Sequence, residues 1–249
     1  MGEATPAKTP MTPGMLLART GTHLLDDGGA AYAALVGGLL YLATTTRPDI
    51  AFAAGVLSRY MHTPEASHWR AAKQVLRYLA GTADLGLCYG GGDGLVACCD
   101  ADFAADVETR RSTTGWLFCW NGAAVSWCSR RQPTVSTSTA EAEYLAAAAA
   151  TKEALWYRKL LADLGEARTT IAIGEDNQAC LAMLTNPEGT GRAKHIDIAH
   201  HMVRDRVARG EVSFHYTPTA EMAADGLTKP LPAAAFTTFR SRLGVRRQG

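Results

Sequence analysis

The chain has 249 residues, with 25 Lys and Arg against 24 Asp and Glu, 47% hydrophobic residues and 20% charged residues. This composition supplies apolar material for one or two cores and excludes disorder as the main state. The longest apolar run, Ala31 to Ala43, is too short to span ~30 Å of hydrocarbon, and the amino end lacks a signal-peptide pattern. We therefore expect a soluble, intracellular protein without a membrane segment.

The cysteines form no CxxC pair, which favours buried free thiols over disulfides or zinc ligands. Two of them, Cys98 and Cys99, are adjacent and would point to opposite faces of a strand. The full set is Cys88, Cys98, Cys99, Cys119, Cys128 and Cys180.

Residues 1–30 are rich in Pro, Gly, Thr and Ala without a sustained period, which predicts a loose N-terminal arm. A helical pattern then continues to Gly81, which ends it. Pro48 suits a first helical position, and in Thr63-Pro64-Glu65 the threonine can cap a helix that begins at the proline. We therefore predict a small helical module over residues 31–89.

A glycine-rich stretch at residues 90–94 breaks this pattern, because glycines cost too much backbone entropy inside an element, and it marks a domain boundary. Beyond it the hydrophobic period changes from about 3.6 to about 2 residues. Asn121-Gly122 is a strong hairpin signal. A three-stranded antiparallel meander is expected, with strands at Leu95–Asp100, Gly115–Trp120 and Ala123–Arg130.

Helices and strands alternate after the meander. A capping-box pattern at residues 136–143 predicts a helix start, and Gly165 ends this helix. A strand follows at Thr170–Asp176, and a helix starts at Asn177. A second helix at His195–Arg209 and a last strand at Glu211–Tyr216 complete the order. The order predicts an α/β fold: a mixed sheet of three antiparallel strands and then parallel strands, flanked by helices. This domain takes residues 95–235, and residues 236–249 form a basic C-terminal tail. We expect the tail to be solvated, and contact with a polyanion is the alternative.

Strand directions bring four acids to one end of this sheet. The first and third strands of the meander are parallel, and a right-handed crossover makes the strand that ends at Asp176 parallel to the one that ends at Asp100. Glu143 lies in the first turns of a helix that starts at this end, where open α/β sheets bind ligands. The last strand, if it runs the same way, is followed by Asp225. We therefore expect these four acids to converge.

Such a cluster needs cations or protons, because like charges repel and raise each other's pKa. Carboxylate oxygens suit Mg²⁺ or Mn²⁺ better than zinc. Two such ions ~4 Å apart can activate water and stabilise the leaving oxygen in phosphodiester hydrolysis. The alternative is that the acids are ordinary caps and surface charges. In that case Glu143 interacts with the helix dipole, and Asp176 is the N-cap of the next helix. Four acids at one end favour the metal site.

Seven segments resemble, in order, the ribonuclease H domain at the carboxyl end of copia-type retrotransposon polyproteins. They are Cys99-Asp100-Ala101-Asp102-Phe103-Ala104, Arg110-Arg111-Ser112-Thr113-Thr114-Gly115, Val125-Ser126-Trp127 with Arg130-Arg131-Gln132-Pro133-Thr134-Val135, Ser138-Thr139-Ala140-Glu141-Ala142-Glu143-Tyr144, Glu175-Asp176-Asn177-Gln178, Lys194-His195-Ile196-Asp197-Ile198 and Ala224-Asp225-Gly226-Leu227-Thr228-Lys229-Pro230-Leu231. Residues 32–81 are similar to the region that connects the polymerase to this domain.

The resemblance implies a ribonuclease H fold that cuts the RNA strand of RNA/DNA hybrids with two Mg²⁺ ions, for which Mn²⁺ can substitute. It assigns catalysis and metal binding to Asp100, Glu143, Asp176 and Asp225. It also implies two partners, the hybrid and the polymerase part of the same polyprotein, and a location in a cytoplasmic virus-like particle or the nucleus.

The sequence also departs from the family pattern. Phe103 replaces the usual Trp, Ala105 replaces the usual Gly, and no Tyr-x-Asp-Asp polymerase motif is present. The alternative function is a catalytically inactive nucleic-acid-binding or linker module with the same fold, which a decayed retroelement would leave, and the four intact acids favour the enzyme over it. An integrase or a junction resolvase is a third, which the Ala-Asp-x-Leu-Thr-Lys-Pro-Leu ending disfavours.

Basic residues flank the hairpin at the carboxylate end. Together with a nearby serine they are candidate substrate-binding residues that would hold phosphates: Arg110, Arg111, Arg130, Arg131 and Ser138. A solvated rim is the alternative for the arginines.

Other polar and aromatic residues are assigned to the surface or the core. Residues i and i+5 point apart on a helix, so a metal cluster of His195, His200 and His201 is disfavoured. The tryptophans of the meander are expected to pack the sheet: Trp116, Trp120 and Trp127.

Overall fold

A five-stranded mixed sheet forms the centre of the protein, with strand order β4-β3-β2-β5-β6. The computed structural model describes residues 5–15, 17–21, 29–92, 94–166, 168–185 and 194–247, and of residues 194–200 the backbone alone. The strands of this sheet are β2 Leu95–Ala101, β3 Thr113–Trp120, β4 Ala123–Arg131, β5 Ile171–Glu175 and β6 Val212–Tyr216.

Strands β2, β3 and β4 form the predicted antiparallel meander. Asn121 and Gly122 have φ angles of 49° and 82°, the left-handed pair that a type I′ hairpin turn requires. β2 extends one residue further than predicted and β3 begins two residues earlier, because Ala101 pairs with Thr114 in the ladder. The meander is therefore confirmed, with slightly longer strands.

Strands β5 and β6 are parallel to each other, and β5 is parallel to β2. The connection from the meander to β5 is α4, Thr139–Asp163, whose N-cap Ser138 accepts a hydrogen bond from Glu141 N. This crossover brings the carboxyl ends of β2 and β5 to the same edge of the sheet, as the order of elements predicts.

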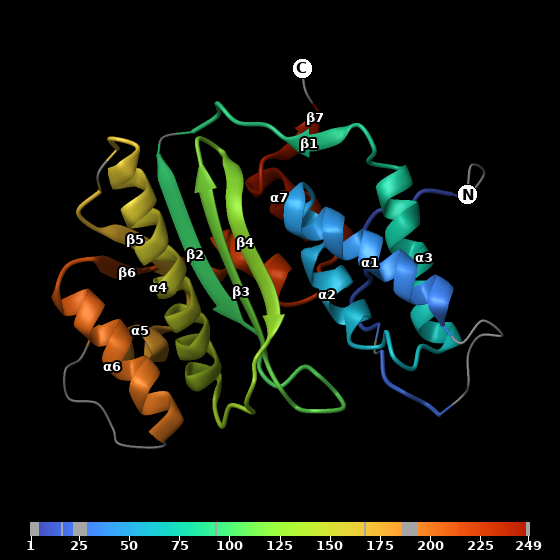
Figure 1. Ribbon diagram of the computed structural model, residues 1–249, viewed down its shortest axis with the longest axis horizontal. Helices are drawn as coiled ribbons and strands as arrows, with labels where there is room; N and C mark the ends of the chain where they lie inside the picture. The colour runs from blue at the N-terminus through green and yellow to red at the C-terminus, as the bar shows by residue number, and fades with distance from the viewer. Residues whose placement is uncertain are drawn as a thin grey trace.

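Helices cover both faces of the sheet (Figure 1). On one face lies α4, followed by α5, Gln178–Thr185, and α6, Lys194–Ala208. Small side chains let α4 pack closely, and the core here includes Phe118, Tyr144 and Ile173. Cys99 lies in this core and Cys98 in the one on the opposite face, as strand alternation predicts. All six cysteines are free.

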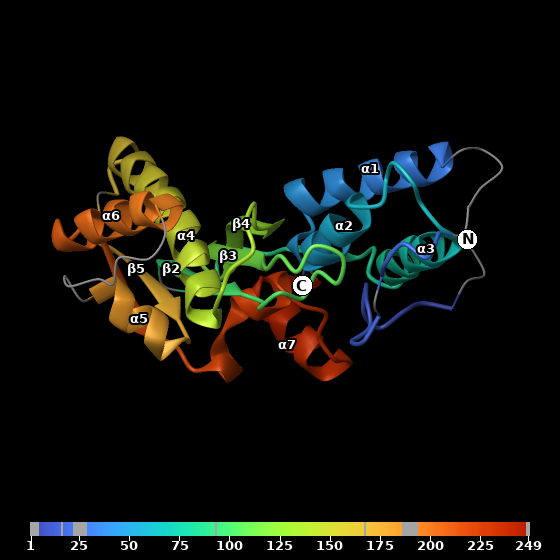
Figure 2. The ribbon, with the colours of Figure 1, turned by 90° about the horizontal axis from the view of Figure 1, so that it is seen from below.

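The other face is covered by segments from both ends of the chain. The N-terminal helices are α1 Ala30–Thr45, η1 Pro48–Ile50, α2 Ala51–Ser58 and α3 Ala66–Ala80. Their apolar side chains share one continuous core with the sheet, in which Tyr32 and Leu57 are grouped with Leu117. Figure 2 shows α2 next to β4, with α3 farther from the sheet. The helical module is thus packed against the sheet.

The start of α3 differs from the prediction. Thr63 is not the N-cap, and Pro64 is not in the helix. Instead Glu65 caps it in a reciprocal arrangement in which His68 Nδ1 accepts from Glu65 N at 2.8 Å. The helix begins later because the Glu65 carboxylate also accepts hydrogen bonds from Thr20 and Gly21, which fixes it outside the helix.

The predicted loose N-terminal arm is wrong for its described residues. Met11 and Leu17 are buried. Tyr60 donates its hydroxyl to Leu17 O, and Arg19 pairs with Glu108 at 2.9 Å. The arm therefore crosses α2 and reaches the loop between β2 and β3.

The predicted solvated tail at residues 236–249 is also wrong for the part that the structure describes. Residues Ala233–Arg242 form α7, and Val245–Arg247 form β7, which pairs antiparallel with β1, Leu85–Leu87. Phe236 and Phe239 are buried, so the segment packs by its apolar residues, while Arg246 and Arg247 are exposed and Arg240 and Arg242 are partly exposed. Three-residue strands carry too little pattern to be read from sequence.

No helix in the described part of the chain is both long and apolar enough to cross a membrane.

Gly115 is expected to be intolerant of a side chain. A Cβ there would lie 2.7 Å from Thr228 Cγ2 and 3.0 Å from Ala224 O. We predict that Gly115→Ala lowers the free energy of unfolding by about 1–3 kcal/mol through overpacking, measured by urea denaturation. Gly37→Ala is the control, since a Cβ at Gly37 meets nothing within 4 Å and alanine favours the helix. Equal stability of the two variants would contradict the prediction.

Candidate metal centre

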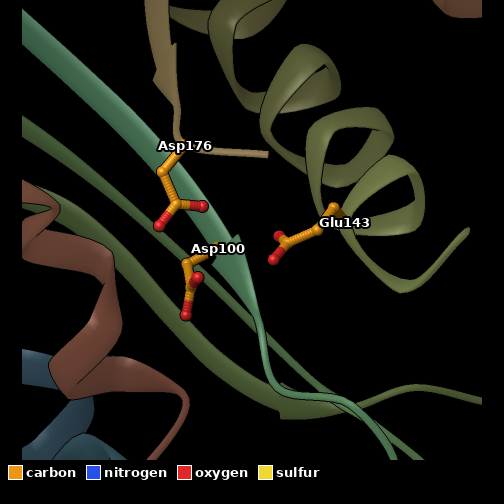
Figure 3. A group of neighbouring side chains, drawn as sticks. All are labelled: Asp100, Glu143 and Asp176. Carbon is orange, nitrogen blue, oxygen red and sulfur yellow. The ribbon is translucent and has the colours of Figure 1, made fainter. Parts of the chain in front are cut away.

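Three carboxylates meet at the carboxyl end of β2 and β5. Asp100, Glu143 and Asp176 each offer one oxygen, and these oxygens lie within 4.8 Å of one another. The side chains come from β2, from the first turns of α4 and from the residue after β5 (Figure 3). Asp100 is 4% exposed and Glu143 6%, so two of the three are withdrawn from water.

Each carboxylate is held by a neighbouring group. Thr228 Oγ1 donates to Asp100 Oδ2. Ala101 N donates to Glu143 Oε2 at 2.7 Å, and Thr219 Oγ1 donates to Asp176 Oδ2 at 2.7 Å. These bonds fix the orientation of all three side chains.

The same contacts argue against ordinary capping roles. Glu143 reaches across to the backbone of β2 instead of its own helix terminus. The cap of α5 is Asn177, whose Oδ1 accepts from Cys180 N at 2.9 Å, so Asp176 is left for the carboxylate group. The cap-and-surface alternative therefore fails for these two acids.

A further buried acid, Glu175, was not among the predicted site residues. Its side chain is fully buried and accepts hydrogen bonds from Asn177 N at 3.0 Å and from Cys99 Sγ at 3.4 Å. Strand alternation could have found it, because Glu175 has the parity of Ile171 and Ile173, which face α4.

Burial and mutual repulsion raise the pKa of these acids. For Asp100, desolvation first and the charge of Asp225 second raise the pKa to about 7. Desolvation and the charges of Asp100 and Glu175 raise the pKa of Glu143. Desolvation also raises the pKa of Glu175 to about 8. These ligands are all carboxylate oxygens, and their buried negative charges repel one another. Such a set fits a hard divalent ion such as Mg²⁺.

The fourth predicted acid lies beside this group rather than in it. Asp225 is in the short 3-10 helix η3, Ala223–Leu227, which follows β6. Its Oδ1 pairs with Lys229 Nζ at 2.8 Å. Asp225 is near enough to raise the pKa of Asp100, yet among the described residues the grouped oxygens belong to the other three acids. Of the four acids predicted to converge, the structure groups three, and Asp225 lies beside them.

The predicted arginines lie at the carboxylate end of the hairpin. Arg130 pairs with Thr114 and Arg131 with Thr113, one and two residues beyond Gly115, which pairs with Asp100. Arg131 Nη1 is committed to Asp106 Oδ2 at 3.0 Å, a structural ion pair. Arg130 is exposed.

The loop between β2 and β3 carries the remaining arginines. Arg110 is exposed and adopts a φ of 54°, and Arg111 is partly exposed. Phe103 in the same loop is 47% exposed, which leaves an aromatic side chain open to solvent near the carboxylates.

The other predicted residues have structural positions. The Ser138 hydroxyl accepts from Glu141 N at 3.2 Å as the cap of α4. His195 and His200 lie outside the residues with described side chains, and His201 is exposed. Trp116 and Trp127 pack against the cores as predicted: Trp116 meets Phe118 edge-on, and Trp127 donates to Ala43 O at 2.6 Å. Trp120 belongs to neither core, and the guanidinium group of Arg168 lies over its ring.

Two known proteins are similar along almost the whole chain. The chain is 38% identical over 251 residues to the Retrovirus-related Pol polyprotein from transposon TNT 1-94 of Nicotiana tabacum, which covers 98% of this chain and 19% of that protein. It is 40% identical over 248 residues to the corresponding polyprotein from transposon RE1 of Arabidopsis thaliana, covering 98% of this chain and 17% of that protein. The chain therefore spans less than a fifth of the length of these relatives.

No protein-family model matches the chain. Among solved structures, RNase H1 from the halophilic archaeon Halobacterium salinarum NRC-1 gives a TM-score of 0.39 at 21% identity, covering 55% of this chain and 95% of that chain. The fold described above rests on the strand order and directions themselves.

The raised pKa values predict a pH-dependent effect of metal on stability. Without metal, the folded protein holds protons on Asp100 and Glu175 that the unfolded chain has lost, so stability falls as pH rises from about 4 towards about 8. Mg²⁺ binds the deprotonated acids, so it should raise the melting temperature more at about pH 8 than at about pH 5. Thermal melts in chelator and in Mg²⁺ measure this.

The control for this prediction is Asp163→Asn, at an exposed position near the end of α4, which should leave the Mg²⁺ effect unchanged. Asp100→Asn should diminish it. An Mg²⁺ effect of the same size at both pH values would count against a metal site at these acids.

Proposed function

Because the chain belongs to the Pol polyproteins of copia-type retrotransposons, as a region with a ribonuclease H-like fold, we propose that it is a metal-dependent endonuclease that hydrolyses the RNA strand of RNA/DNA hybrids. The observation that carries this proposal is the convergence of Asp100, Glu143 and Asp176 from three separate elements. Acids such as Asp49, Asp106 and Glu108 pair with arginines, whereas these three are held by neutral donors.

Two Mg²⁺ ions, or Mn²⁺ in their place, would supply an activated water and stabilise the leaving oxygen when bound by these acids. The residues of the chain do the positioning. Thr228 and Thr219 aim Asp100 and Asp176, and the rigid edge of β2 holds Glu143 through Ala101 N. Ligands held this way need little reorganisation at the moment of reaction.

The proposed substrate contacts lie on the rim. Arg110 and Arg130 are exposed and Arg111 is partly exposed, so these three can meet phosphates, while Arg131 supports the loop through Asp106. Ser138 lies at the N-terminus of α4, where backbone N–H groups favour anions. We propose the RNA/DNA hybrid as substrate and the polymerase part of the same polyprotein as partner, acting in a virus-like particle or the nucleus.

Asp176→Asn should abolish hydrolysis of the hybrid while leaving the fold and hybrid binding intact. The amide is nearly isosteric with the carboxylate but is a neutral and weaker ligand for Mg²⁺. Cleavage of a labelled hybrid with and without Mg²⁺ measures the loss, and a binding assay in Ca²⁺ measures retention. Asp163→Asn is the matched control. A variant that still cleaves at near the parental rate would refute the role of Asp176.

Asp100 and Asp102 should differ sharply although both are acids of one motif. Asp102 is turned to its own loop, where its Oδ1 accepts from Ala105 N at 3.3 Å. We predict that Asp100→Asn lowers turnover by a factor on the order of a thousand and Asp102→Asn by about tenfold or less. Measuring the turnover number of both variants at saturating Mg²⁺ tests this difference. Similar losses in both variants would mean that Asp102 also serves the reaction directly.

A further inference from the structure

Lys229 lies at the margin of the carboxylate group. η3 ends in a tight turn in which Thr228 N and Lys229 N both donate to Asp225 O, at 3.2 and 3.1 Å. This turn places Lys229 Nζ 2.8 Å from Asp225 Oδ1. The same turn directs Thr228 Oγ1 to Asp100, so the lysine and the first acid of the group are tied to one backbone segment.

The positively charged Lys229 side chain lies among negatively charged acids. Burial lowers its pKa, but the contact with Asp225 and the charges of Asp100 and Asp176 raise it overall. The nearby arginines are engaged elsewhere, since Arg59 and Arg131 both pair with Asp106. Lys229 is therefore positioned to offset part of the negative charge of the site.

We propose that Lys229 is a resident counter-cation that holds Asp225 away from the other three acids, so that a divalent ion reaches Asp225 only by displacing the lysine. Asp225 Oδ1 is buried and has the Lys229 ammonium group 2.8 Å away, so a Mg²⁺ ion bound to this oxygen at about 2.0–2.1 Å would be repelled by that ammonium group. Lys229 thus sets the affinity of the weaker of two ions and acts as a positioning residue.

The side chains suit this exchange. The Asp225 side chain is 17% exposed and stays in place on η3, whereas the Lys229 side chain is 46% exposed. A lysine has a flexible four-carbon stem, so its ammonium group can move into solvent without a change in the backbone. Asp225 is then freed to join Asp100.

The inference rests on the proposed metal site but not on nuclease activity, so calorimetric titration of the metal-free protein with Mg²⁺, without nucleic acid, tests it. The parent should bind one ion more weakly than the other. Lys229→Met should tighten the weaker binding by roughly tenfold, the order expected when a competing close ion pair is removed. Lys229→Arg, which keeps charge and reach, should behave like the parent, and Lys229→Gln provides a second neutral variant.

The double variant with Asp225→Asn separates a direct exchange from a general change in charge. If Lys229 acts through Asp225, Lys229→Met should have little further effect in the Asp225→Asn background. An equal tightening in both backgrounds, or none in either, overturns the proposal. A parent that binds no Mg²⁺ overturns it together with the metal site, whereas the expected titrations without any hybrid cleavage support it and refute the proposed function.

Discussion

The packing of several carboxylates into one dehydrated space is the constraint on which the rest of the structure depends. Asp100, Glu143 and Glu175 have raised pKa values because each loses water and faces like charges. The surrounding chain compensates with neutral donors, from the hydroxyl of Thr228 to the backbone of Ala101. Such an arrangement lowers stability unless a cation or protons complete it, which is the expected cost of a binding site.

The donors come from distant parts of the chain, so the site depends on the whole fold. Thr228 can reach Asp100 because Gly115, opposite Asp100 in the ladder, has no side chain to keep η3 away. η3 is packed in turn within the core that includes the N-terminal helices. The helical module therefore supports one wall of the site rather than serving as a spacer.

A second network links that module to the rim. Asp106 accepts from Arg59 at the end of α2 and from Arg131 at the end of β4. Burial would raise the pKa of Asp106, but hydrogen bonds from Thr109 and Arg131 lower it to about 2, so the carboxylate stays charged at neutral pH. The loop that carries the exposed arginines is thus fixed to the helical module as well as to the sheet.

The sequence alone determined the parts of this protein that depend on local pattern. Alternation and the Asn121-Gly122 turn define the meander, and chain order with crossover handedness places Asp100, Glu143 and Asp176 at one edge. Local pattern could not decide which neighbour each acid meets. The Asp225–Lys229 pair, the folded C-terminal segment and the capping of α3 by Glu65 are contacts chosen by packing. These contacts depend on the burial and the charges of residues far apart in the sequence, which only the tertiary structure brings together.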